Sequence, residues 1–265
     1  MKEIRIVSLY SGSQGNACLI STAEGSILID AGKSAKKLCA ALADAGVSPE
    51  ELKAIFITHE HNDHVGALAV LLKRHKIPVH LPTGCAYKLS CEERVAPCLC
   101  EHPPIFCETV AGMTVTSFPT PHDSRASVGY HIEIPREDGS VFRIGYATDI
   151  GYVSREVEAG LLGCEAVVLE SNHDPDMLRD GPYPYDLKLR ISSRRGHLSN
   201  PESAAFAARL CAAGTKYLML AHLSQENNTP DTAYDECIGA VGDEGVRICV
   251  AQPDAITELM GGSML

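Results

Sequence analysis

The chain has 265 residues, of which 45% are hydrophobic, and a formal net charge of −11 at pH 7. This length and apolar content are sufficient for a sizeable core and favour one large domain, residues 1–265, over two small ones. The acidic balance argues against non-specific adhesion to nucleic acid, which needs a basic surface, and the apolar runs fall short of the ~18 residues that a membrane span requires.

Short runs rich in Ile, Val and Leu recur along the chain and predict β-strands. These runs begin at Ile4, Cys18, Ser26, Ala54, Met113, Val128, Val141, Ala166, Tyr217 and Arg247. Segments rich in Ala and Leu predict helices over residues 34–45, 65–75, 154–162, 201–213 and 232–241. For the helix at 201–213, we expect Asn200 to cap the first turn, Pro201 to occupy the first helical position and Gly214 to end the helix.

The order of these elements predicts an α/β fold. Strands come first and then alternate with helices, and a second run of strands between residues 113 and 147 repeats the scheme. Two sheets, each covered on its outer face by helices, account for this order. Residues 174–195 are rich in turn-forming residues, and we expect a surface loop there.

Eleven cysteines are spread over the chain, and its first residues, MKEIRIVSLYSG, contain no apolar segment of the kind found in a signal peptide. Both features favour reduced thiols and a cytoplasmic protein. Five of the cysteines lie between Cys85 and Cys107, which leaves a structural zinc site as an alternative. We favour packing and loop roles for them, because their spacing matches no common zinc pattern and no histidine pair completes it.

The segment AIFITHEHNDHV contains the strongest functional signal. A predicted strand ending at Thr58 is followed by His59, His61, Asp63 and His64, and a predicted helix begins directly after them. Imidazole and carboxylate groups together suit zinc, manganese or iron, and their alternating spacing lets them point to two neighbouring ions. The sequence therefore predicts a site for two divalent metal ions, with zinc or manganese favoured and iron as an alternative.

HEHNDH resembles the HxHxDH signature of the metallo-β-lactamase fold, a four-layer αββα sandwich, and the other motifs of that family are present in order, one before it and three after it. They are SILIDAG with Asp30, FPTPHDS with His122, YATDIG with Asp149 and LAHLS with His222. The resemblance implies that one metal ion is held by His59, His61 and His122, the other by Asp63, His64 and His222, and that Asp149 bridges the two. It also implies that Asp30 orients the ligand loop without binding metal.

Four further segments closely resemble the YycJ/WalJ-like branch of this superfamily, whose members are associated with 5′-to-3′ exonuclease activity on DNA. They are SLYSGSQGN, LESNHD, GHLSN and AHLSQENNTP, which begin at Ser8, Leu169, Gly196 and Ala221. LESNHD and GHLSN also resemble ribonuclease Z, in which a glutamate and a histidine at these places assist departure of the leaving group. By this resemblance Glu170 and His197 form a pair near the scissile phosphate, and His173 is a further candidate. Purely structural roles for the two histidines are the alternative.

The implied reaction is cleavage of a phosphodiester by a metal-bridging hydroxide, because two close ions lower the pKa of a shared water. An expelled sugar alkoxide is a poor leaving group, so a general acid is needed at the leaving oxygen. We therefore count Glu170, His173 and His197 as catalytic candidates, together with Asp63, which is also a ligand.

Two segments are candidates for contact with the substrate. Ser11, Ser13 and Asn16 lie in a Gly- and Ser-rich segment that presents hydroxyl and N–H groups to a phosphate or simply forms a tight turn. Residues 177–197 carry five cationic side chains against two aspartates, interleaved with Tyr183 and Tyr185. We expect the five cations to bind a nucleic acid strand, with a solvated surface as the alternative. They are Arg179, Lys188, Arg190, Arg194 and Arg195.

These observations predict a two-metal phosphodiesterase, a 5′-to-3′ exonuclease whose partner is nucleic acid, DNA in the first place, and not a membrane. RNA processing of the ribonuclease Z type is an alternative, although the basic arm with which ribonuclease Z grips transfer RNA is missing. Hydrolysis of a thioester or lactone is another, but it leaves His197 and the basic segment unexplained. A flavodiiron oxidoreductase is disfavoured because its motif has Glu in place of His61, and a non-catalytic metal-binding protein because the ligand set is complete. The native metal and the oligomeric state stay open.

Overall fold

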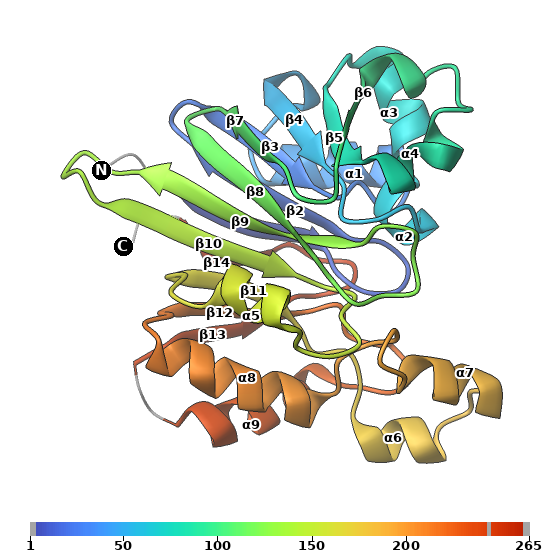
Figure 1. Ribbon diagram of the computed structural model, residues 1–265, viewed down its shortest axis with the longest axis vertical. Coiled ribbons are helices and arrows are strands. Elements are labelled where there is room, and N and C mark those ends of the chain that lie inside the picture. Colours follow the sequence, from blue (N-terminus) through green and yellow to red (C-terminus); the bar gives the residue numbers. More distant parts are fainter. Residues whose placement is uncertain (1–3, 243–244, 262–265) are drawn as a thin grey trace.

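The computed structural model describes residues 4–242 and 245–261, so the first three residues of the segment that argued against a signal peptide lie outside it. In the described part, two seven-stranded sheets pack face to face, with helices on both outer faces (Figure 1). The first sheet has the order β14 (Thr257–Met260), β1 (Arg5–Tyr10), β2 (Ala17–Thr22), β3 (Gly25–Ile29), β4 (Leu52–Phe56), β5 (Val79–Pro82) and β6 (Leu99–His102). The second has the order β13 (Arg247–Val250), β12 (Tyr217–Ala221), β11 (Ala166–Glu170), β10 (Val141–Ala147), β9 (Val128–Pro135), β8 (Met113–Pro119) and β7 (Cys107–Val110).

Each sheet has its own layer of helices. The first is covered by α1 (Ala35–Asp44), α3 (Leu68–Arg74) and α4 (Thr83–Leu89), and the second by α5 (Arg155–Leu161), α8 (Asn200–Ala212) and α9 (Pro230–Val241). The short helices α2 (Asn62–Val65), α6 (Pro175–Asp180) and α7 (Tyr185–Ile191) belong to connecting segments, and α6 and α7 project from the body of the molecule (Figure 1). None of the described helices is long and apolar enough to cross a membrane.

Three layers of buried apolar side chains hold these elements together. The central layer lies between the sheets, where Phe56 and Tyr130 meet edge to face with ring centroids 5.7 Å apart. Leu38 belongs to the layer between the first sheet and its helices, and Phe206 to the layer between the second sheet and its helices. The predicted α/β fold, a four-layer αββα sandwich, is therefore confirmed.

The predicted strands are all found, and four further strands, β5, β6, β7 and β14, were missed. Each of the four has only four residues, and three of them, β6, β7 and β14, lie at or near a sheet edge. Along β7 the side chains alternate between exposed and half-buried, so the strand carries little apolar signal. Short strands of this kind are stabilised by the neighbour that they pair with, which a local pattern does not reveal.

Two local predictions were wrong. Residues 174–195 form α6 and α7 and not a loop, because Asp174 caps α6 by accepting a hydrogen bond from the Met177 N–H at 2.8 Å and proline follows at the first helical position. The cap of α8 is Ser199, not Asn200, since Ser199 and Glu202 form a reciprocal capping box. The Asn200 side chain accepts a hydrogen bond from the Ser171 hydroxyl at 2.7 Å.

Candidate metal centre

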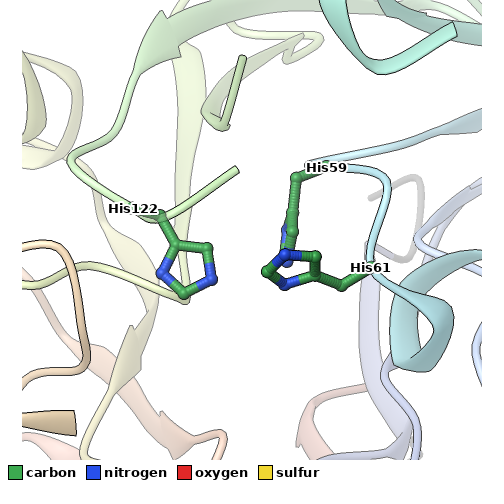
Figure 2. Close-up of side chains that lie close together, drawn as sticks. All are labelled: His59, His61 and His122. Atoms are coloured by element: carbon green, nitrogen blue, oxygen red, sulfur yellow. The ribbon is translucent and has the colours of Figure 1, made fainter. Parts of the chain in front are cut away.

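The residues predicted to hold metal come together where four strands end. His59 follows β4, His122 follows β8, Asp149 follows β10 and His222 follows β12. Figure 2 shows His122 on one side of the site, facing His59 and His61 on the other, with ring centroids 4.9 and 5.2 Å away. Both sheets thus contribute to one site: the loop after β4 comes from the first sheet, and His122, Asp149 and His222 come from the second.

The ligand atoms form two groups that share a neighbour. The ring nitrogens of His59, His61 and His122 lie within 4.8 Å of one another, and so do the ligand atoms of Asp63, His64 and His222. Asp149 lies between the groups. Its Oδ2 is 3.3 Å from His64 Nε2, and its Oδ1 is 3.5 Å from His222 Nε2 and 3.6 Å from His122 Nε2. All seven residues predicted as ligands are therefore in one cluster, with Asp149 at its centre.

The hydrogen bonding of this cluster fits bound divalent metal. Within the described part of the chain, the Nε2 atoms of His59, His122 and His222 and the Oδ2 atom of Asp149 are buried without a hydrogen-bond partner. Buried polar atoms are rarely left unsatisfied, because each costs about 1–3 kcal/mol. The opposite ring nitrogens are engaged: His122 Nδ1 donates to the Gly196 carbonyl at 3.1 Å and His222 Nδ1 to Glu170 Oε1 at 3.0 Å. Metal-binding histidines show this arrangement, in which one nitrogen is oriented and the other left for the ion.

The charge of the cluster points the same way. Burial lowers the pKa of His59 well below its usual value, and the imidazoles of His64 and His122 lower it further, so the ring is neutral, as a ligand must be. Burial also lowers the pKa of His222, but the surrounding carboxylates, Asp149 foremost, more than offset this and raise it to about 10. The carboxylates therefore attract positive charge, which a divalent cation supplies.

Asp30 forms hydrogen bonds to the ligand loop. Its Oδ1 accepts the Thr58 backbone N–H at 2.8 Å, and its Oδ2 accepts His64 Nδ1 at 2.8 Å. The neighbouring Gly32 permits close contact between the loops, since a Cβ there would lie 2.0 Å from the Asp63 carbonyl oxygen. The backbone of Asp30 has a φ of 62°, and Asp149 and His222 have φ values of 55° and 58°. Such left-handed conformations in residues with side chains cost of the order of 1–3 kcal/mol each and cluster at functional sites.

Glu170 and His197 form a pair at the edge of the cluster. Glu170 is fully buried, and its Oε1 accepts His197 Nδ1 at 2.8 Å as well as His222 Nδ1. Its Oε2 accepts the backbone N–H groups of Ile150 at 2.7 Å and Leu198 at 3.2 Å. The His197 side chain is 19% exposed and lies 3.7 Å from Asp149 Oδ1 through Nδ1. One buried carboxylate thus orients both a candidate metal ligand and a candidate general acid.

His173 is not among the groups of potential metal ligands, although it interacts electrostatically with Glu170 and His197. Its side chain is almost completely buried and lines a separate cavity of about 350 Å³ between α6 and α7. Arg179, Lys188 and Tyr185 line the same cavity. Arg179 is paired with the carboxylates of Asp176 and Asp180, so its charge is already compensated.

The predicted phosphate contacts near the N-terminus are only partly available. The Ser11 hydroxyl accepts the His222 backbone N–H at 2.7 Å, and the buried Asn16 amide lies 3.3 Å from Asp63 Oδ2 and 3.1 Å from His64 Nε2. These two side chains are therefore engaged with the metal cluster, whereas Ser13 is exposed.

Asp123 was missed by the sequence analysis. Its Oδ1 is buried without a hydrogen-bond partner in the described chain, 3.3 Å from His122 Nε2 and 4.0 Å from His61 Nε2. Its Oδ2 pairs with Arg190, which was predicted to bind substrate. Its position directly after His122 in PHDS was the available signal, but a carboxylate next to a histidine is common in loops.

A second histidine group lies beside the cysteine-rich region, contrary to expectation. His80 on β5, His102 on β6 and Glu108 on β7 present potential ligand atoms within 4.8 Å of one another. However, His80 Nδ1 and His102 Nε2 lie 3.0 Å apart in a hydrogen bond, and the two rings stack between Phe56 and Phe106. The pair is satisfied within the chain, and none of the eleven cysteines forms a disulfide bond.

Comparison with known proteins agrees with this geometry. The family described as "Beta-lactamase superfamily domain" matches residues 26–222. The exodeoxyribonuclease WalJ of Streptococcus pneumoniae serotype 2 is 33% identical to this chain over 261 residues, which cover 95% of each chain. The exodeoxyribonuclease YycJ of Bacillus anthracis is 34% identical over 229 residues, which cover 85% of this chain and 84% of the relative. Two solved structures share the fold. The metallo-β-lactamase fold protein YhfI of Bacillus subtilis has a TM-score of 0.73 and 18% identity, and the match covers 97% of this chain and 100% of that one. The short form of human tRNase Z has a TM-score of 0.67 and 17% identity, and the match covers 96% of this chain and 99% of that one.

Proposed function

The chain belongs to the β-lactamase superfamily and is a metal-dependent hydrolase, and from this premise we propose that it is a two-metal exonuclease that degrades DNA from the 5′ end. The observation that carries the proposal is the complete cluster of seven ligand-type residues in a chain that is 33% identical, over 95% of its length, to a protein named as an exodeoxyribonuclease. The 5′-to-3′ direction rests on the resemblance of the sequence segments alone.

We assign the ligands as the two groups suggest. His59, His61 and His122 would hold one ion, Asp63, His64 and His222 would hold the other, and Asp149 would serve both. Bound zinc or manganese ions would lower the pKa of a shared water and stabilise the charge on the phosphate under attack. Asp30 and Glu170 keep His64 and His222 in the tautomer that leaves Nε2 for the ion, since each carboxylate accepts a hydrogen bond from Nδ1.

We assign His197 as the general acid. Glu170 accepts the hydrogen bond from His197 Nδ1 at 2.8 Å, which leaves Nε2 as the atom that carries a proton to the departing sugar oxygen. The partial exposure of His197 allows contact with a bound strand, whereas the fully buried Glu170 acts only by orienting it. Asp63, which remains partly exposed, has a second role in orienting the attacking water.

The basic side chains near the cluster fit a polyanion. Arg194 and Arg195 line a cavity that also includes His122, so the cations adjoin the metal centre directly. Lys188 and the exposed ring of Tyr185 border the α6–α7 cavity, where they offer a charge for a phosphate and a face for a base. The net negative charge of the chain then restricts binding to this face. We also infer a single domain and a cytoplasmic location, the latter from eleven cysteines that form no disulfide bond.

The test is gel analysis of 5′- and 3′-labelled single-stranded DNA, double-stranded DNA and RNA, incubated with the protein under Mn²⁺ and under Zn²⁺. Release of mononucleotides from the 5′ end of DNA, abolished in Asp63→Ala, is the expected result. Preferred cleavage of RNA would favour the ribonuclease Z alternative instead. Intact nucleic acids together with hydrolysis of a thioester or lactone would overturn the proposal.

A further inference from the structure

A cavity of about 640 Å³ opens beside the metal centre. It is lined by His122 and by Arg125, Arg194 and Arg195, and we call it the arginine pocket. Pockets that bind small ligands have volumes of about 300–1,000 Å³, so this cavity is large enough for a nucleotide-sized ligand. His122 belongs both to the lining of the pocket and to the metal cluster, so the pocket lies next to the metal centre.

The guanidinium groups of the three arginines form no ion pair within the described residues, although the Arg125 backbone N–H donates to Glu60 Oε1 at 3.1 Å. Arg195 donates from Nε to the His122 carbonyl at 3.1 Å and from Nη2 to the Ser124 carbonyl at 3.4 Å, which are neutral acceptors. The guanidinium of Arg194 lies 4.0 Å above the Tyr152 ring, and that of Arg125 lies 4.2 Å above the Tyr87 ring. Their positive charges are therefore not compensated.

Two of the other predicted basic residues, Arg179 and Arg190, differ in this respect. Arg179 and Arg190 each form ion pairs with aspartates, and Arg179 borders the other cavity. Lys188 donates to the neutral Arg179 carbonyl at 2.7 Å and keeps its charge, so the arginine pocket holds most, and not all, of the unpaired positive charge of this face.

The position of the pocket is built into the backbone. Gly151, two residues after Asp149, lies so close to the chain at Arg194 that a Cβ would be 2.4 Å from the Arg194 carbonyl carbon. Its N–H donates to the Pro121 carbonyl at 2.8 Å. The loops that carry His122, Asp149 and the arginines are therefore packed as one unit, so the distance from pocket to metal centre is constrained.

We propose that the arginine pocket binds the terminal 5′-phosphate of the DNA strand while the metal centre cuts the next phosphodiester, an inference that rests on the proposed exonuclease function. A terminal phosphate carries about −1.5 to −2 charges at pH 7, twice that of an internal diester, and guanidinium groups bind it through paired hydrogen bonds. The three arginines therefore match the charge of a terminal phosphate better than the charge of an internal diester.

The reaction restores its own substrate. The bond between phosphorus and the 3′ oxygen of the terminal nucleotide breaks, the water oxygen bonds to phosphorus, and a proton ends on the 3′ oxygen. The products are a nucleoside 5′-monophosphate and a strand shortened by one residue, whose new end again carries a 5′-phosphate. The pocket therefore suits repeated removal of single nucleotides.

The experiment compares two 3′-labelled duplexes of the same sequence, one with a 5′-phosphate and one with a 5′-hydroxyl, using the metal-loaded protein. We expect kcat/KM to be roughly tenfold or more higher for the phosphorylated end, as the loss of one charge-assisted contact predicts. Arg125→Ala and Arg194→Ala should each reduce cleavage of the phosphorylated duplex by a larger factor than cleavage of the hydroxyl duplex, so that the ratio of the two rates falls. Arg143→Ala is the matched control, because this exposed arginine pairs with Glu133 on the β9–β10 face.

Equal rates on the two duplexes with the wild-type protein would overturn the inference while leaving the exonuclease function intact. Binding of fluorescent single strands to the Asp63→Ala protein, measured by anisotropy, tests the pocket without cleavage. A preference for the 5′-phosphate in binding, combined with no DNA cleavage by the wild type, would support the pocket and refute the exonuclease. No preference in binding counts against the pocket whatever the cleavage result.

Discussion

Substitution of His197 by alanine separates proton donation from metal binding. Its Nδ1 hydrogen-bonds Glu170 at 2.8 Å, and its side chain is 19% exposed at the edge of a cluster in which it is not assigned as a ligand. A general acid typically contributes about 10²- to 10⁴-fold, so we expect kcat on DNA to fall by that factor, or about 3–5 kcal/mol of barrier. Metal content should stay at two ions per chain.

The change should also be mild for the fold. Glu170 loses one of four hydrogen bonds, a contact worth about 1.5–3 kcal/mol with a charged acceptor, and keeps those from His222, Ile150 and Leu198. The free energy of unfolding should therefore drop by about 1–2 kcal/mol, since a water can replace the partly exposed imidazole.

The assay uses two substrates that differ in leaving group. Labelled DNA expels a sugar alkoxide, which needs a proton, whereas bis(p-nitrophenyl) phosphate expels a stable phenolate, which does not. His197→Ala should lose rate on DNA and change by less than roughly tenfold on the phenyl ester. His75→Ala is the matched control. His75 Nδ1 is 3.1 Å from the Glu50 carboxylate, and its side chain is 18% exposed at the C-terminal end of α3. Equal losses on both substrates would refute proton donation by His197.

Three further outcomes are expected. Asp30→Asn should weaken metal binding about 10- to 100-fold in a zinc titration, because the amide cannot accept from both Thr58 and His64; unchanged affinity would contradict the anchoring role. Removal of metal by a chelator should lower Tm, because metal at a free concentration ~1,000 times Kd stabilises the folded state by about 4 kcal/mol. A Tm that does not change on chelation would argue against metal at this site. Ser199→Ala should cost about 1 kcal/mol in urea unfolding through loss of the capping box with Glu202, and a neutral result would mean that water caps α8 equally well.

Much of the site was predictable because its chemistry is local. His59, His61, Asp63 and His64 lie within six residues, so their proximity follows from the chain alone. The predicted strands were long or continuously apolar, such as β11, in which all five residues are buried, and such runs carry their own signal. The two-sheet architecture followed from the order of these elements.

Other features depend on contacts between distant segments. Asp149, Glu170 and His222 meet because β10, β11 and β12 are parallel neighbours, so their carboxyl ends share one edge of the sheet. The roles of Ser11 and Asn16 changed because their polar atoms meet the metal cluster once the chain is folded.

The sequence by itself determined the kind of chemistry, since ligand types and their local spacing select metal ions and a hydrolytic reaction. Only the tertiary structure decided which charges are available. Arg179 and Arg195 are alike in sequence, but Arg179 lies against aspartates of its own helix, while Arg195 lies against two carbonyl groups beside His122. The physical reason is that electrostatic interactions depend on distances across the folded surface, and a linear pattern of charges does not contain those distances.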